Sequence, residues 1–213
     1  MSKDELRWIG IGGLVFVVLA VVLVLVTPSP PAIHASAAKL ASHYTKSKQG
    51  LFLAGGFVTM GAVVVGGFWF WYFRELLAGV TGGRRLATVG FAGAVLFAAG
   101  GGLAAGLDFV ISDAVGHASV STIEALNYFR ADLNLGLTAT GVVLFLLTTA
   151  LVVIRFRALP VWLGWVAIVF AVATFLITPL ALLCVGVWMI PTNIVLIARS
   201  RSGAEAMAAE GQV

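Results

Sequence analysis

Charged residues are scarce in this sequence. Asp, Glu, Lys and Arg make up 10% of its 213 residues, whereas 61% of the residues are hydrophobic. A soluble domain of this length could not bury so much apolar surface. The composition therefore excludes an ordinary soluble domain and predicts that the chain lies in an apolar solvent, the lipid bilayer.

Residues that carry chemistry are also few. Cys184 is the one cysteine, so no disulfide can form within the chain. His34, His43 and His117 fall outside the apolar runs, and no lysine lies within one, which excludes a retinal-type Schiff base. Metalloprotease, nucleophile-elbow, P-loop and dinucleotide-binding motifs are absent. The sequence therefore predicts no catalytic site, no metal site and no cofactor.

Long apolar runs, by contrast, are abundant. A membrane-spanning helix needs about 20 apolar residues, and Thr178-Pro179 divides the long stretch 161–198 into two short halves. We predict an all-α membrane helical bundle, a single domain over 1–213, with six transmembrane helices and a polar tail at 199–213. The predicted spans are 8–26, 50–73, 86–111, 133–154, 161–178 and 180–198. The alternative is five spans, with one half of 161–198 re-entrant or interfacial.

The first apolar run has a rival interpretation as a secretory signal peptide, with Ala35-Ser36-Ala37 as the cleavage site. The run is long for the apolar region of a signal peptide, and the candidate site lies well beyond its end. We therefore expect a first helix that is retained.

Lys and Arg are distributed unequally between the two sides of the predicted membrane. Six spans place nine of the 13 basic residues on the side of both termini and four on the other side. Basic residues favour the cytoplasmic side, so we predict cytoplasmic termini in a bacterial cytoplasmic membrane. Two arginine clusters are predicted to contact anionic lipid head groups, and no nucleic acid is needed to explain the positive charge. The clusters are Arg74, Arg84 and Arg85, and Arg155 and Arg157.

Six consecutive aromatic residues, FWFWYF at 68–73, stand directly before Arg74. A helix turns about 100° per residue, so these side chains point all round the axis and do not form one face of a pocket. A ring of aromatic side chains at one depth is typical of a membrane interface. We predict an interfacial belt that consists of Trp69, Trp71, Trp162 and Trp165.

Glycine is frequent in the runs 50–73 and 86–111, and Gly102 and Gly106 form a G-x-x-x-G pair. Small residues let membrane helices approach one another closely. The pattern favours ordinary packing inside the bundle. Homo-oligomerisation through these two glycine-rich helices is the alternative.

A few polar residues are candidates for a functional site, because ionisable groups within a membrane are costly. Asp108 and Arg130 lie near the outer ends of the third and fourth spans, where they can pair, and Asp132 follows closely. Such a pair forms either the mouth of a pathway or a salt bridge that fixes two helices. Pro191, which lacks an N–H and kinks a helix, stands near Asn193 in the middle of the last span.

The segment Ser121-Thr122-Ile123-Glu124 has the pattern of a capping box. It predicts a helix that starts near Ser121 and runs directly into the fourth span. This inference concerns structure and carries no chemistry.

Three stretches carry a resemblance to known proteins. They are LASHYTKSKQGLFLAGGFVTMGAVVVGGFWFWYFREL, ALNYFRADLNLGLTATGVVLFLLTTALVVIRFRALPVWLGWVAIVFAVATFLI and LLCVGVWMIPTNIVLIAR. Together they resemble a broad group of uncharacterised bacterial integral membrane proteins, frequent in actinobacteria. The resemblance implies six helices, with a short helix before the second span and an A-L-P-x-W-L-G-W turn before the fifth. It implies no catalytic residues.

These features predict a non-enzymatic membrane protein that acts as an accessory, scaffold or lipid-interacting component. The alternative is a small transporter or permease subunit for an apolar or lipid-like solute, with a mouth at Asp108 and Arg130 and a kink at Pro191. A membrane enzyme that acts on lipid is a third hypothesis, and it would depend on Asp108 and the three histidines.

Overall fold

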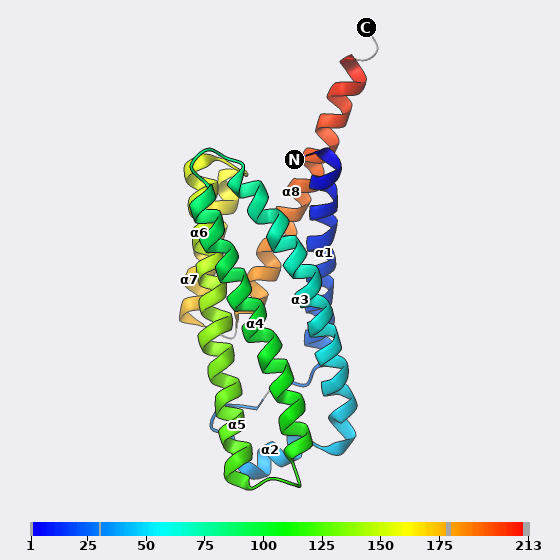
Figure 1. Ribbon diagram of the computed structural model, residues 1–213, viewed down its shortest axis with the longest axis vertical. Coiled ribbons are helices and arrows are strands. Elements are labelled where there is room, and N and C mark those ends of the chain that lie inside the picture. Colours follow the sequence, from blue (N-terminus) through cyan, green and yellow to red (C-terminus); the bar gives the residue numbers. More distant parts are fainter. Residues whose placement is uncertain (1, 30, 178–179, 211–213) are drawn as a thin grey trace.

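The computed structural model describes residues 2–29, 31–177 and 180–210, and across these residues the chain is built from helices and short connections (Figure 1). The long helices are α1 (Lys3–Val26), α3 (Gln49–Ala78), α4 (Arg84–Ala114), α6 (Thr140–Phe156), α7 (Val161–Leu176) and α8 (Ala181–Glu210). The short elements are α2 (Ala37–His43), η1 (Lys46–Lys48), α5 (Val120–Leu133) and the π-helical turn η2 (Asn134–Ala139), which joins α5 to α6. The predicted all-helical class is confirmed.

Five helical stretches in the described part of the chain are long and apolar enough to cross a membrane. They are Lys3–Val26, Lys46–Ala78, Arg84–Ala114, Val120–Phe156 and Ala181–Arg201. Helix α7 is apolar as well but has only 16 residues. The fold is therefore consistent with a helical membrane bundle, in which helices satisfy their own backbone hydrogen bonds. The predicted break at Thr178-Pro179 lies outside the described residues.

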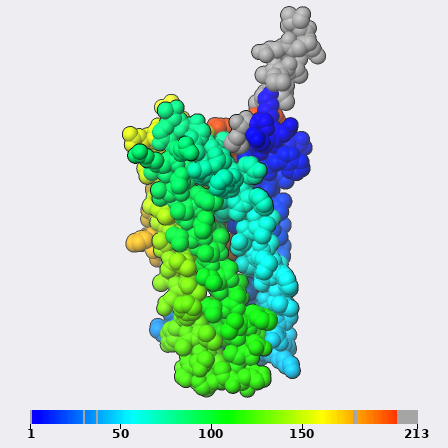
Figure 2. Space-filling view, viewed as in Figure 1, coloured from blue at the N-terminus to red at the C-terminus, as the bar shows by residue number. Residues whose placement is uncertain are grey.

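The long helices form a closed ring. Its order is α1, α3, α4, α6, α7 and α8, and α8 closes the ring against α1. Figure 2 shows one face of this ring, on which α4 lies between α3 and α6. Helix α1 begins and α8 ends at the same end of the bundle, which we call the terminal end, whereas α2 and α5 lie at the opposite end, the α2/α5 end (Figure 1).

Aromatic side chains fill the half of the ring nearer the terminal end. Trp69 stacks on Phe73 with ring centroids 4.7 Å apart, and Phe145 and Trp188 pack against this pair. Both indoles are hydrogen-bonded: Trp69 Nε1 donates to Asn193 Oδ1 at 2.8 Å, and Trp188 Nε1 donates to a backbone carbonyl at 3.0 Å. Buried indole N–H groups need such partners, so this core fixes the facing helices in one arrangement.

The prediction that Trp69 belongs to an interfacial belt is wrong, because its side chain is only 2% exposed and lies in this core. The run 68–73 does point all round the helix axis, and for that reason part of it faces the ring interior. Phe70 and Phe73 are buried with Trp69. The other predicted belt residues are exposed for about half of their surface, as a belt requires; they are Trp71, Trp162 and Trp165.

Two helix ends differ from the sequence prediction. The helix expected near Ser121 is present and runs into α6, but its N-cap is Ser119, whose hydroxyl accepts a hydrogen bond from the Thr122 amide at 3.3 Å. Glu124 therefore lies too far into the helix to complete a capping box. At the other end of the chain, the predicted polar tail is helical as far as Glu210, because α8 continues into it.

Candidate ligand-binding cavity

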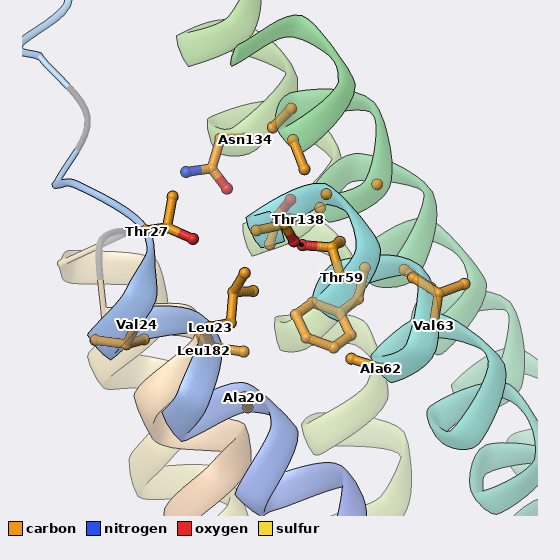
Figure 3. A pocket seen from close by; sticks show the side chains of 18 of the residues that line it. Ala20, Leu23, Val24, Thr27, Thr59, Ala62, Val63, Asn134, Thr138 and Leu182 are labelled. Carbon is orange, nitrogen blue, oxygen red and sulfur yellow. Dashed lines mark hydrogen bonds between the residues drawn. The ribbon is translucent and has the colours of Figure 1, made fainter. Parts of the chain in front are cut away.

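A cavity of about 330 Å³ lies inside the ring, at the level where α1 ends and α8 begins. Its apolar walls come from several helices and include Ala20, Leu23, Ala62, Val63 and Leu182 (Figure 3). The aromatic core ends at this cavity. Beside the cavity, α3 and α4 carry small residues in place of aromatic ones. Those that line the cavity include Gly55, Gly56, Gly66, Gly67, Ala98, Gly101, Gly102, Ala104 and Ala105. The space exists because these residues have too little side chain to fill the ring.

The lining of the cavity also includes polar residues. Thr27, Thr59, Asn134 and Thr138 lie around the open space in Figure 3. The Thr59 hydroxyl donates to a backbone carbonyl of its own helix at 2.8 Å. The hydroxyl oxygens of Thr27 and Thr138 are buried and have no hydrogen-bond partner among the described residues. Both pack against glycines, since a Cβ on Gly55 would come within 2.6 Å of the Thr27 oxygen and a Cβ on Gly100 within 2.5 Å of the Thr138 oxygen. Neither oxygen therefore faces the open space.

The π-helical turn η2 places Asn134 and Thr138 at the cavity. π-Helical turns are rare in proteins, and those that occur are often found at functional sites. Helix α4 approaches this turn closely, since a Cβ on Gly100 would come within 2.7 Å of the Thr138 amide nitrogen. Sequence reasoning missed both residues, because nothing in the segment NLGLTA distinguishes a π-helical turn from an ordinary helix.

An ion pair lies at the α2/α5 end of the cavity. Arg130 Nε is 3.5 Å from Asp108 Oδ1, which confirms the predicted pair, and both residues line the cavity. The Tyr44 hydroxyl donates to the same Asp108 oxygen at 2.6 Å. Arg130 Nη2 donates to the Pro31 carbonyl at 3.2 Å and to Asn127 Oδ1 at 3.1 Å. The buried guanidinium is therefore neutralised by α4 and held by the Pro31 carbonyl and by Asn127 of its own helix.

Two titratable groups beside this pair have shifted pKa values. Burial, and then the charge of Asp108 and the hydrogen bond to it, raise the pKa of Tyr44, so its phenol stays protonated and remains a donor. Burial, and then the positive charges of Lys48 and Arg130, lower the pKa of His43 below its usual value of 6.5. The neutral form of His43 is therefore favoured beside the ion pair.

The remaining polar candidates lie elsewhere. Asp132 is exposed and is not among the residues that line the cavity. Asn193 is fully buried, accepts the Trp69 hydrogen bond and donates to the Met189 carbonyl at 2.8 Å. Helix α8 is continuous through Pro191. Asn193 therefore belongs to the aromatic core, and neither Pro191 nor Asn193 lines the cavity.

The three histidines occupy separate positions. His34 Nδ1 lies 3.3 Å from the Tyr128 hydroxyl, and His117 Nδ1 lies 3.2 Å from the Asp113 carbonyl oxygen. His43 packs against aromatic rings. Within the described ranges, no three His, Cys, Asp or Glu side chains are grouped so that they could hold a metal ion.

Comparisons of this chain with protein-family models, with curated proteins and with solved structures find no match. The interpretation of the cavity therefore rests on its own geometry.

Proposed function

We propose that this chain is a non-enzymatic, multi-pass protein of the bacterial cytoplasmic membrane that binds a lipid-like amphiphile in the cavity. The observation that carries the proposal is an apolar cavity whose lining also includes the polar side chain of Asn134 and, at one end, the ion pair of Asp108 with Arg130. Sites for small molecules are mostly apolar, with a few polar groups that orient the ligand, and their volumes start near 300 Å³. A molecule with an apolar chain and a hydrogen-bonding head fits this description.

The proposal includes six spans with both termini in the cytoplasm. Counting about 20 residues from Arg85 along α4 puts the far membrane boundary near Ala105, and the same count back from Arg155 reaches Leu135. Asp108 and Arg130 then lie about one turn beyond this boundary. The polar end of the cavity would accordingly lie at the depth of the outer head groups, where a lipid carries its own polar part.

Cysteine accessibility tests this topology. In a Cys184→Ala background, Ser47→Cys should react with a membrane-impermeant maleimide in intact cells, and Thr81→Cys should react only after lysis. Leu180→Cys should behave like Ser47→Cys if α7 spans the membrane. Protection of Leu180→Cys from both sides would favour five spans with a re-entrant α7.

Native mass spectrometry of the protein in its own lipids tests the binding proposal. The wild-type protein should retain a defined amphiphile, and Asn134→Leu should lose it, because leucine is close to asparagine in size but has no hydrogen-bonding group. Asp132→Leu is the matched control, since Asp132 is likewise a polar, exposed residue two positions away but does not line the cavity. A wild-type protein that carries only mixed bulk lipid would overturn the proposal.

Transport of a lipid-like solute is the second candidate, and the aromatic core weighs against it. Trp69, Phe73 and Trp188 are at most 2% exposed and fill the ring between the cavity and the terminal end. A solute would have to displace them to cross the membrane, so this arrangement favours binding over passage. Membership of the actinobacterial group and contacts of the arginine clusters with anionic lipids remain predictions.

A further inference from the structure

The segment 31–45, which we call the α2 strap, lies at the α2/α5 end of the bundle and contains α2 (Figure 1). Most of its residues are exposed. Leu40 and Tyr44 are fully buried and belong to a small apolar cluster that is separate from the aromatic core. The other buried members of this cluster are Phe52, Ile111 and Ile123. A segment with so few buried apolar side chains can open locally while the rest of the fold stays intact.

Polar side chains of α4 and α5 hold the strap at both of its ends. Asp108 accepts the hydrogen bond of the Tyr44 hydroxyl, and Arg130 donates to the Pro31 carbonyl. Asn127 supports the second contact, because its Nδ2 donates to two further carbonyls of the strap at 3.2 Å. The strap is therefore tied to the same ion pair that lies at the end of the cavity, and the balance of charge there bears on its docking.

His43 lies inside this docked arrangement. Its ring packs against Tyr44 with centroids 4.7 Å apart and against Phe52 with centroids 5.7 Å apart. Its Nε2 is buried and has no hydrogen-bond partner among the described residues. Both nitrogens of a protonated ring are donors, so protonation would bury an N–H group and a positive charge without an acceptor, which is costly.

The charges around His43 do not offset a further proton. Lys48 and Arg130 are positive, and both disfavour a charged imidazole. The Asp108 carboxylate is already engaged by Tyr44 and Arg130. The remaining charged side chains of the strap, η1, α4 beyond Asp108 and α5 are at least partly exposed, and they are Lys39, Lys46, Asp113, Glu124 and Asp132. The docked strap therefore requires a neutral His43.

We propose that the α2 strap is an acid-sensitive switch, which stays docked on α4 and α5 while His43 is neutral and is released when His43 takes up a proton. Release separates Tyr44 from Asp108 and Pro31 from Arg130, so it uncovers the ion pair at the end of the cavity. The switch follows from contacts within the chain and requires no bound ligand. In the proposed topology it would respond to the pH outside the cytoplasm.

The sign of the response follows from linkage. The pKa of His43 is lowered in the docked strap and should return toward its usual value of 6.5 in the released strap. The released state then binds the proton more tightly. The equilibrium constant for release should rise by up to about tenfold for each pH unit below 6.5, until the pKa of the docked form is reached, and should be constant above 6.5.

Hydrogen exchange of the full chain in lipid nanodiscs tests the inference. In the docked strap the Leu40 amide donates to the Ser36 carbonyl and the Tyr44 amide donates to the Leu40 carbonyl, both at 2.9 Å. At about pH 5.5 these amides should exchange up to about tenfold faster in the wild-type protein than in His43→Gln, which takes up no proton. At about pH 7.5 the two proteins should exchange equally. A comparison at one pH removes the intrinsic pH dependence of exchange.

Two further variants sharpen the test. His34→Gln is the matched control, since His34 lies on the same strap but is exposed, with its Nδ1 3.3 Å from the Tyr128 hydroxyl. It should keep the wild-type response. His43→Lys places a positive charge at the switch at both pH values, so its strap amides should exchange fast at both.

Four outcomes would overturn the inference. The first is equal exchange of the wild-type protein and His43→Gln at both pH values. The second is slower exchange of the wild-type protein at the lower pH, which would show that the aromatic rings stabilise the charged imidazole. The third is loss of the response in His34→Gln. The fourth is equal acceleration of amides in α6, such as that of Phe145, which would show global unfolding. None of these outcomes bears on ligand binding, which mass spectrometry tests separately.

Discussion

The two halves of the bundle share α3, α4 and the continuous helix from α5 to α6 but are filled differently. Toward the terminal end, Trp69, Phe73, Phe145 and Trp188 close the interior. Toward the α2/α5 end, glycine and alanine leave a cavity. Helix α4 shows the contrast within one element, because a Cβ on Gly93 would collide with α6 whereas a Cβ on Gly102 would meet no atom within 4 Å. One half is therefore closely packed, and the other contains an open space.

The largest expected effect comes from filling a glycine in the packed half. Gly93→Leu should destabilise the protein by about 3 kcal/mol or more, since its side chain would collide with the α6 backbone. Gly102→Leu should leave stability unchanged or raise it by up to about 1 kcal/mol, through the better helix propensity of leucine. Denaturant unfolding in mixed micelles measures both. Equal losses for the two variants would remove the distinction between the halves.

The buried asparagine of the packed half gives the next effect. Asn193→Leu should cost about 2–3 kcal/mol, because it leaves the Trp69 indole N–H buried without a partner. Asn134→Leu, in the open half, should cost less than about 0.5 kcal/mol, because Asn134 is exposed. The near-ultraviolet circular dichroism of Trp69 should change in the first variant only. A large loss in Asn134→Leu would show that the open half is also tightly packed.

The ion pair at the end of the cavity should have a smaller effect. Asp108→Asn keeps the shape of the side chain but leaves the Arg130 charge unbalanced, and it should cost about 1–2 kcal/mol because Asp108 is partly exposed. Tyr44→Phe removes only one hydrogen bond and should cost about 1 kcal/mol. A double-mutant cycle measures the coupling between these two positions. Strictly additive effects would show that the hydrogen bond and the ion pair act independently.

The smallest effect expected is a pH dependence from His43. Its pKa is lowered in the folded protein, so the unfolded chain binds more protons once the pH falls below 6.5. Stability should therefore decrease as the pH drops from 6.5 toward the lowered pKa, and it should be unaffected by this group above 6.5. Unfolding at several pH values, with His43→Gln as control, measures the effect. The control should show a weaker decrease; an identical pH profile would assign the dependence to other groups.

The sequence by itself indicated a lipid environment and the positions of the long helices. Apolar runs of spanning length predicted the helices because burying polar groups in lipid is costly wherever they fall along the chain. The same cost predicted that Asp108 would lie near Arg130, since two isolated charges at a membrane boundary lower their free energy by pairing. Both arguments use local composition and need no knowledge of neighbouring helices.

Only the tertiary structure decided which side of each helix faces inward. All six residues of 68–73 are aromatic, so the sequence does not show which of them face the ring interior. The burial of Trp69 and the exposure of Trp71 depend on where α1, α4 and α8 lie. The same holds for Gly93 and Gly102. Both are glycines of one helix, but a Cβ on Gly93 would collide with α6 and a Cβ on Gly102 would meet no atom within 4 Å. The cavity exists because helices that are far apart in the chain pack around it. A local sequence pattern cannot show which distant helices will be neighbours.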